Sequence, residues 1–201
     1  MKKSQIAIAL AGMALFVSSV FAEGVRTTTR TGEREGGRAR WTAQHQRGER
    51  TAVTEGEGRR TENGRAWRSE TTFTDRKGET RTLVTNGTAT RTVSYDGYPV
   101  IHRQWTRVRD DGTTVTGSSE TLVTPGPNGR SWETTGSRTG PRDTTDFTGS
   151  GTSTRTENGS TWRATRQATD SNGREWTSQT TGTSTRTENG RRWTSETRAN
   201  R

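Results

Sequence analysis

The chain lacks cysteine altogether and contains only two histidines, His45 and His102. Without cysteine it can form no disulfide, the usual stabilising device of small exported proteins, and it can perform no thiol chemistry. Neither histidine has a second plausible ligand near it in the sequence, so a histidine-based zinc site is not expected. We therefore predict neither a metal site nor a cofactor.

Apolar residues are also scarce, since they make up 22% of the 201 residues. So little aliphatic material excludes a thick hydrophobic core and is typical of disordered chains. Two features favour a folded protein instead. Threonine, which is enriched in β-strands, is abundant, and the chain contains seven tryptophans, a residue in which disordered segments are poor.

The first 22 residues have the three parts of a secretory signal. Lys2 and Lys3 precede an uncharged apolar run at residues 6–17, and Ser-Ser-Val-Phe-Ala follows at residues 18–22. The apolar run is shorter than the ~20 residues that a membrane-spanning helix needs. We expect residues 1–22 to be a cleavable signal peptide, and the mature protein to be periplasmic or secreted, without a transmembrane segment.

A short unit, Asn-Gly-x-x-Trp, occurs five times in the chain. Its copies are residues 63–67, 128–132, 158–162, 172–176 and 189–193. A longer stretch, Gly151 to Ala164, recurs as Gly182 to Ser195. Such self-similarity indicates that the chain is built from one repeated structural unit.

The Asn-Gly dipeptide predicts the structure of that unit. Asn-Gly between alternating segments is a strong signal for a β-hairpin, because a type I′ turn needs positive φ at both central residues. Lys77-Gly78, Asp96-Gly97 and Asp111-Gly112 fall on a similar spacing. We therefore predict an all-β protein, a repetitive antiparallel β-hairpin meander that forms a thin sheet, a β-roll or a solenoid-like array.

Two regions follow the signal peptide in this prediction. Residues 61–201 form the Asn-Gly-x-x-Trp hairpin repeat region. Residues 23–60 contain Gly36-Gly37 and Glu55-Gly56-Glu57-Gly58 and offer little to bury. We expect this Gly/Arg/Glu-rich segment to be a flexible N-terminal part.

The predicted turn also fixes which residues face each other. With Asn189-Gly190 at the tip, Arg186 lies opposite Trp193. The same register pairs Arg155 with Trp162 and Arg60 with Trp67, and an arginine over an exposed indole is worth about 0.5–1 kcal/mol. These pairs predict a surface for polyanion binding or self-association. Its residues are Arg60, Trp67, Trp132, Arg155, Trp162, Trp176, Arg186 and Trp193.

No motif in the chain supports catalysis. The serines lack a G-x-S-x-G elbow, and the glycines make no G-x-G-x-x-G phosphate loop. Asp110-Asp111, Asp143 and Asp146 lie where turn residues are expected rather than as paired catalytic carboxylates. A membrane-spanning barrel is disfavoured as well, because both alternating faces carry Thr, Ser, Arg and Glu. We predict that the protein is not an enzyme.

The charge favours an acidic partner. The chain carries a net charge of +10, and beyond the signal peptide this comes from arginine, which binds carboxylates, sulfates and phosphates with two parallel hydrogen bonds. Acidic polysaccharide, lipopolysaccharide and extracellular DNA are candidate partners, together with further copies of the chain.

Three functions remain open at this stage. The first is an exported structural or adhesive protein of the bacterial cell surface or extracellular matrix. The second is a soluble periplasmic or secreted binding module for an acidic polysaccharide, lipopolysaccharide or DNA. The third, suggested by Thr-x-Thr runs such as Thr152, Thr154 and Thr156, is an ice-binding protein.

Overall fold

A computed structural model describes residues 26–47, 50–188 and 190–200. The predicted signal peptide, residues 1–22, lies outside this part of the chain. The described residues form twelve β-strands. They are β1 (Arg26–Glu35), β2 (Arg38–Arg47), β3 (Arg50–Thr61), β4 (Gly64–Thr74), β5 (Thr80–Val93), β6 (Pro99–Arg109), β7 (Thr114–Gly126), β8 (Gly129–Thr139), β9 (Thr144–Thr156), β10 (Gly159–Asp170), β11 (Glu175–Thr187) and β12 (Gly190–Asn200).

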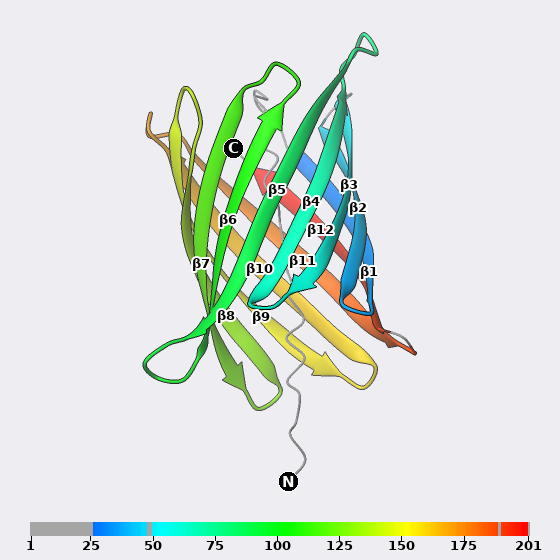
Figure 1. Ribbon diagram of the computed structural model, residues 1–201, viewed down its shortest axis with the longest axis vertical. Helices are drawn as coiled ribbons and strands as arrows, with labels where there is room; N and C mark the ends of the chain where they lie inside the picture. The colour runs from blue at the N-terminus through cyan, green and yellow to red at the C-terminus, as the bar shows by residue number, and fades with distance from the viewer. Residues whose placement is uncertain (1–25, 48–49, 189, 201) are drawn as a thin grey trace.

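The strands form an antiparallel meander that closes into a barrel (Figure 1). Each strand pairs with the next along the chain, and β12 pairs with β1 from Arg26↔Ala199 to Glu35↔Gly190. The predicted all-β hairpin meander is confirmed, whereas its closure into a barrel was not predicted. Closure pairs every strand on both sides, so the described part of the chain presents no open sheet edge to another molecule.

The segment predicted to be flexible differs from that expectation. Of residues 23–60, those at 26–47 and 50–60 belong to β1, β2 and β3 and complete the barrel wall. They do have something to bury, because Trp41, Ala43 and Ala52 are each 5% exposed. Of its glycines, Gly32 and Gly56 lie beneath tryptophan rings, whereas Gly36 and Gly37 form the β1–β2 turn with positive φ.

Besides the β1–β2 turn at Gly36-Gly37, four hairpin loops use a glycine in the left-handed region, as the sequence predicted. Gly78, Gly97, Gly112 and Gly173 have φ between 74° and 82°. In each loop the amide of this glycine donates a hydrogen bond to the carbonyl three residues earlier, as in Gly78 to Asp75 and Gly173 to Asp170. These are three-residue loops with glycine at the αL position rather than two-residue type I′ turns.

Two of these loops begin with an aspartate whose carboxylate accepts backbone hydrogen bonds. One of these aspartates is buried and the other is exposed, so the pair tests how burial changes the contribution of such bonds to stability. Asp170 accepts hydrogen bonds from the amides of Asn172 (2.9 Å) and Arg174 (3.0 Å), and its side chain is 5% exposed. Asp75 makes the equivalent bonds in an exposed loop. We expect Asp170→Ala to lower the free energy of unfolding by about 1–3 kcal/mol, and Asp75→Ala by less than about 1 kcal/mol, because water can replace only the exposed acceptor. Urea unfolding measures both, and equal losses would contradict the argument.

The other Asn-Gly dipeptides lie differently from the prediction. Thr61 pairs with Gly64 and Thr156 with Gly159, so the turn tips are Glu62-Asn63 and Glu157-Asn158. The glycine is then the first residue of the following strand, where a β-carbon would overlap a carbonyl of the next strand: Ala89 for Gly64 and Ser184 for Gly159. Glycine is needed at these positions for the close approach of two backbones, not for a positive φ.

Tryptophans and glycines alternate around the inner wall. Six of the seven tryptophans lie on even-numbered strands, and each ring covers a glycine of the following strand so closely that a β-carbon there would overlap the indole. The pairs are Trp41 with Gly56, Trp67 with Gly87, Trp105 with Gly117, Trp132 with Gly151, Trp162 with Gly182 and Trp193 with Gly32. We call this arrangement the indole–glycine ring. It fills the barrel interior despite the lack of aliphatic residues.

Threonine and serine hydroxyls occupy much of the remaining inner wall. Thr54 and Thr71 are 4% and 2% exposed, and their hydroxyls are 2.8 Å apart. Thr54 also bonds His45 Nε2 at 2.9 Å, and His45 Nδ1 lies 2.9 Å from the Thr28 hydroxyl. A chain of such bonds lets polar side chains be buried at little cost, because each donor finds an acceptor.

Charges are divided between the two faces of the wall. Side chains alternate between the faces along each strand, and this alternation places nearly every acidic strand residue outside. These are Glu33, Glu35, Glu55, Glu57, Glu70, Glu120, Glu133, Asp146, Glu175 and Glu196. On the inner face the acidic exception is Asp170, at the end of β10, while arginines recur there. The inside of the barrel is therefore basic, although the outside is mixed.

Candidate functional site

The tryptophans of the predicted binding surface point into the barrel. Trp67 and Trp162 are 5% and 7% exposed, and Trp132 and Trp193 pack against the buried cluster that contains Trp67. Trp176 also lies on the inner face, near Arg138. These rings cannot form an exposed polyanion-binding or self-association surface, and the prediction is corrected in this respect.

The predicted arginine–tryptophan pairs are also wrong. Arg60 lies opposite Arg65, and Trp67 lies opposite Gly58. Likewise Arg186 faces Arg191 and Arg155 faces Ser160, whereas Trp193 and Trp162 face Ser184 and Ser153. The turn tip is one residue earlier than predicted, which shifts every pair by two positions. A shift of two preserves the face, so these arginines share the inner face with the tryptophans but lie beyond them, towards the barrel end.

Arginines gather at that end of the barrel, the lower end in Figure 1, where β1–β2, β3–β4 and β9–β10 turn. Arg34 pairs with Arg191, Arg60 with Arg65, and Arg186 with Arg191. Arg130 and Arg155 complete the group from β8 and β9. We call these seven residues the arginine mouth: Arg34, Arg60, Arg65, Arg130, Arg155, Arg186 and Arg191.

The pKa values show that these guanidinium groups act on one another. Burial, followed by the charges of Arg34 and Arg60, lowers the pKa of Arg65 to about 10. Burial also lowers the pKa of Arg130, and the next causes are Arg191 and Arg155. Arg130 and Arg191 belong to β8 and β12, so the repulsion reaches beyond neighbouring strands. An anion held here would relieve that repulsion.

A second group of arginines lies deeper, around a cavity of about 130 Å³. Arg103, Arg107, Arg138 and Arg166 line it, together with aromatic rings that include Trp67, Trp105, Trp162 and Phe147. We call it the arginine cavity. The Arg166 guanidinium lies 3.4 Å from the centroid of the Phe147 ring, and Arg103 donates a hydrogen bond to the Thr121 hydroxyl at 2.8 Å.

The deeper arginines carry large pKa shifts. Burial lowers the pKa of Arg103 to about 10. Burial, followed by repulsion from Arg107, Arg138 and Arg103, lowers the pKa of Arg166 to about 9. Both values stay above neutral pH, so these side chains are charged inside the barrel. Ionisable groups with strongly shifted pKa values are typical of functional sites.

Sequence reasoning missed the arginine cavity although the signal was present. In the stretch from Arg103 to Arg107, arginine, tryptophan and arginine occupy alternate positions around Trp105. Period-two alternation therefore puts Arg103 and Arg107 on the same face as that ring.

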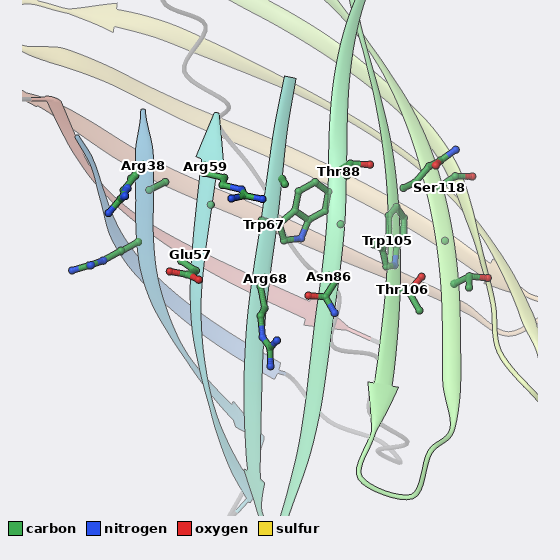
Figure 2. A pocket seen from close by; sticks show the side chains of 18 of the residues that line it. Arg38, Glu57, Arg59, Trp67, Arg68, Asn86, Thr88, Trp105, Thr106 and Ser118 are labelled. Atoms are coloured by element: carbon green, nitrogen blue, oxygen red, sulfur yellow. The ribbon is translucent and has the colours of Figure 1, made fainter. Parts of the chain in front are cut away.

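The outer wall also carries a groove, of about 1140 Å³, which crosses the strands from β2 to β8. Figure 2 shows Arg38, Arg59 and Arg68 beside Glu57 and Asn86 along this groove. The charges are mixed and the remaining lining is mostly threonine, serine and glycine. The groove offers hydrogen bonds without a concentrated charge and is the weaker candidate for recognition.

Within the described ranges, no cluster of histidine, aspartate and glutamate side chains could hold a metal ion. The same part of the chain contains no helix long and apolar enough to cross a membrane. Comparison with known proteins found no family model and no curated protein sequence that matches this chain.

Proposed function

We propose that this protein is an exported binding module that holds an acidic polysaccharide at the arginine mouth. The observation that carries the proposal is the mutual repulsion of the mouth arginines. Besides burial, every charged group that shifts the pKa of Arg34, Arg65, Arg130 and Arg191 is another arginine. Carboxylate or sulfate groups of a ligand would supply negative charge to this group through bidentate hydrogen bonds.

The shape of the site favours a flexible acidic chain over duplex DNA. The mouth arginines come from seven strands, β1, β3, β4, β8, β9, β11 and β12. A ring of donors can surround a bent saccharide chain, whereas a stiff duplex would touch such a ring along one line only. Single-stranded DNA is also disfavoured. Proteins that bind it stack its bases on exposed aromatic rings, whereas the tryptophans of this protein lie inside the barrel.

The structural or adhesive role stays a prediction. A closed barrel offers no strand edge for assembly, so copies would have to associate through the wall. Ice binding also stays a prediction, and it gains no support, because Arg163 lies between Thr152 and Thr181 in the outer threonine rows. The export that all three functions require rests on the sequence of residues 1–22.

The test replaces Arg60, Arg155 and Arg186 by glutamine in one variant. These side chains are exposed, so the barrel should fold unchanged. We expect affinity for heparin to fall at least about tenfold, and the plot of log affinity against log salt to become shallower by about 2, because fewer counter-ions are released. Affinity chromatography and calorimetry over a salt series provide the measurement.

The matched control replaces Arg68, Arg142 and Arg163, which are exposed arginines away from the mouth, so the net charge changes equally. If both triple variants lose the same affinity, binding follows net charge and the proposal fails. The same binding measurements with duplex DNA and with lipopolysaccharide identify the class of ligand. Tighter binding to either than to heparin or alginate would overturn the choice of polysaccharide.

A further inference from the structure

We propose that Tyr95, in the loop between β5 and β6, stacks on a sugar ring of the polysaccharide held at the arginine mouth. This inference rests on the proposed function and deepens it, because it makes the sugar ring, and not only its acidic groups, part of what is recognised. Both tyrosines of the chain, Tyr95 and Tyr98, lie in this loop. Tyr95 is fully exposed, and Tyr98 is 38% exposed.

The backbone of this loop does not require an aromatic residue. The β4–β5, β6–β7 and β10–β11 loops are closed by the same hydrogen bond, from the glycine amide to the carbonyl three residues earlier. At the two positions that tyrosine occupies here, those loops have polar residues. They are Arg76 and Glu79, Asp110 and Thr113, and Ser171 and Arg174. The fully exposed Tyr95 ring also buries no surface within the protein, so its presence is not explained by folding.

The position of the loop relates it to the arginine mouth. Successive turns of the meander alternate between the two ends of the barrel, so the three polar loops lie at the opposite end, whereas the β5–β6 loop lies at the mouth end, the lower end in Figure 1. Its neighbours at that end are the β3–β4 hairpin, with Arg60 and Arg65, and the β7–β8 hairpin, with Arg130. A ligand that spans the mouth between these hairpins passes the tyrosine loop.

Hydrogen bonds hold the loop in one conformation. The Ser94 amide donates to the Tyr98 carbonyl at 2.7 Å, and the Tyr98 amide donates to the Ser94 hydroxyl at 3.0 Å. The Gly97 amide donates to the Ser94 carbonyl at 3.0 Å. Because the backbone on both sides of Tyr95 is already ordered, little conformational entropy is lost when its ring contacts a ligand.

The chemistry of the loop favours a saccharide over a lipid surface. A tyrosine ring has an apolar face and a hydroxyl group, and a sugar ring likewise has a C–H face and a rim of hydroxyls. Stacking therefore removes two apolar faces from water and leaves both polar rims solvated. Insertion into a membrane needs a broader apolar face, whereas Ser94, Asp96 and Gly97 surround Tyr95. Asp96 is acidic, so the contacts with the anionic groups remain with the mouth arginines.

The experiment measures the binding of heparin and of linear polyphosphate to the mature protein by calorimetry. Arginine can bind the anionic groups of both polymers, but only heparin contains sugar rings. We expect Tyr95→Ala to weaken heparin binding about fivefold, the scale of one aromatic contact, and to leave polyphosphate binding unchanged. The slope of log affinity against log salt should also stay the same, because an uncharged ring releases no counter-ion.

Three further variants serve as controls, and all replace exposed side chains, so the barrel should fold unchanged. Tyr95→Phe keeps the ring and should bind heparin nearly as tightly as the wild type. Tyr95→Leu is apolar but has no ring face, and it should resemble Tyr95→Ala. Ser171→Ala changes the equivalent position of the β10–β11 loop and should have no effect. In protein with labelled tyrosine rings, heparin should shift the NMR signals of Tyr95, and polyphosphate should not.

The inference is overturned if Tyr95→Ala binds heparin as tightly as the wild type, or if it loses the same factor of affinity for polyphosphate. It is also overturned if Tyr95→Ala loses binding to vesicles of phosphatidylcholine and phosphatidylglycerol but not to heparin, because the loop would then contact a lipid surface. The triple variant of the mouth separates the two proposals. If that variant keeps its heparin affinity, the proposed function fails together with this inference. If it loses that affinity while Tyr95→Ala does not, only this inference fails.

Discussion

Replacing Gly56 by alanine is expected to lower the free energy of unfolding by about 2–3 kcal/mol, the range for adding a methyl group to a well-packed interior. The new β-carbon would overlap the indole of Trp41, which is 5% exposed and packed within the buried cluster. The ring cannot swing outwards, because the barrel wall lies behind it. Urea unfolding of the purified variant measures the loss.

Gly58 provides the matched control, since it lies on the same strand and the same face, two residues further on. An added β-carbon there would have its nearest neighbour at 3.4 Å. Gly58→Ala should therefore cost less than about 1 kcal/mol. A double variant that also replaces Trp41 by leucine should recover part of the Gly56→Ala loss, as contacting residues are not additive. Equal losses in the two single variants would refute the indole–glycine ring as a packing constraint.

Replacing Gly159 by alanine is expected to cost more, at least about 3 kcal/mol or loss of folding. Here the added β-carbon meets the backbone carbonyl of Ser184 rather than a side chain, and that carbonyl belongs to the strand ladder between β10 and β11. Moving it would break inter-strand hydrogen bonds. Overlaps that no rotamer can relieve belong to the largest effects of single substitutions.

The comparison for this variant is Gly126→Ala, at the end of another hairpin arm. The nearest atom to a β-carbon at Gly126 is 3.9 Å away, the carbonyl of Gly129, and the φ of Gly126 is not positive. We expect Gly126→Ala to change stability by less than about 1 kcal/mol. A thermal melt that finds Gly159→Ala as stable as Gly126→Ala would show that the strands can separate here without loss.

The hairpin meander was predictable because turn glycines and alternating threonines are local signals. Asn172-Gly173 behaves as such a signal suggests, with φ of 74° at Gly173. Asn158-Gly159 does not, since its glycine is fixed by contact with Ser184 on the next strand, β11. The same dipeptide thus serves two purposes, and only the partner strand decides between them.

The error in register explains most of the error in the site. One misplaced turn tip moved Arg60 from its true partner, Arg65, to Trp67. The resulting pairs looked like an exposed surface, whereas the tryptophans fill the interior. The alternation itself was correct, so the arginines were assigned to the proper face. The sequence did not predict closure of the sheet, which makes one face the interior of the barrel.

Closure depends on contacts between the two ends of the described chain, which no local pattern reveals. Gly32 on β1 receives the ring of Trp193 on β12. Composition alone made residues 23–60 look unable to pack, because a glycine beneath a ring contributes to packing only through its lack of a side chain. The packing role of Gly32 and Gly56 can be recognised only when their partners, Trp193 and Trp41, are known.

Each hairpin contributes one indole and one glycine that lies beneath the indole of a neighbouring hairpin. Duplication of one hairpin therefore keeps the number of indoles equal to the number of glycines that accommodate them. The similarity of Gly151–Ala164 and Gly182–Ser195, which cover the turns and the adjoining parts of the strands in the β9–β10 and β11–β12 hairpins, is what such a duplication would leave. The number of strands in the barrel can therefore grow two at a time, because each added hairpin carries its own indole and glycine.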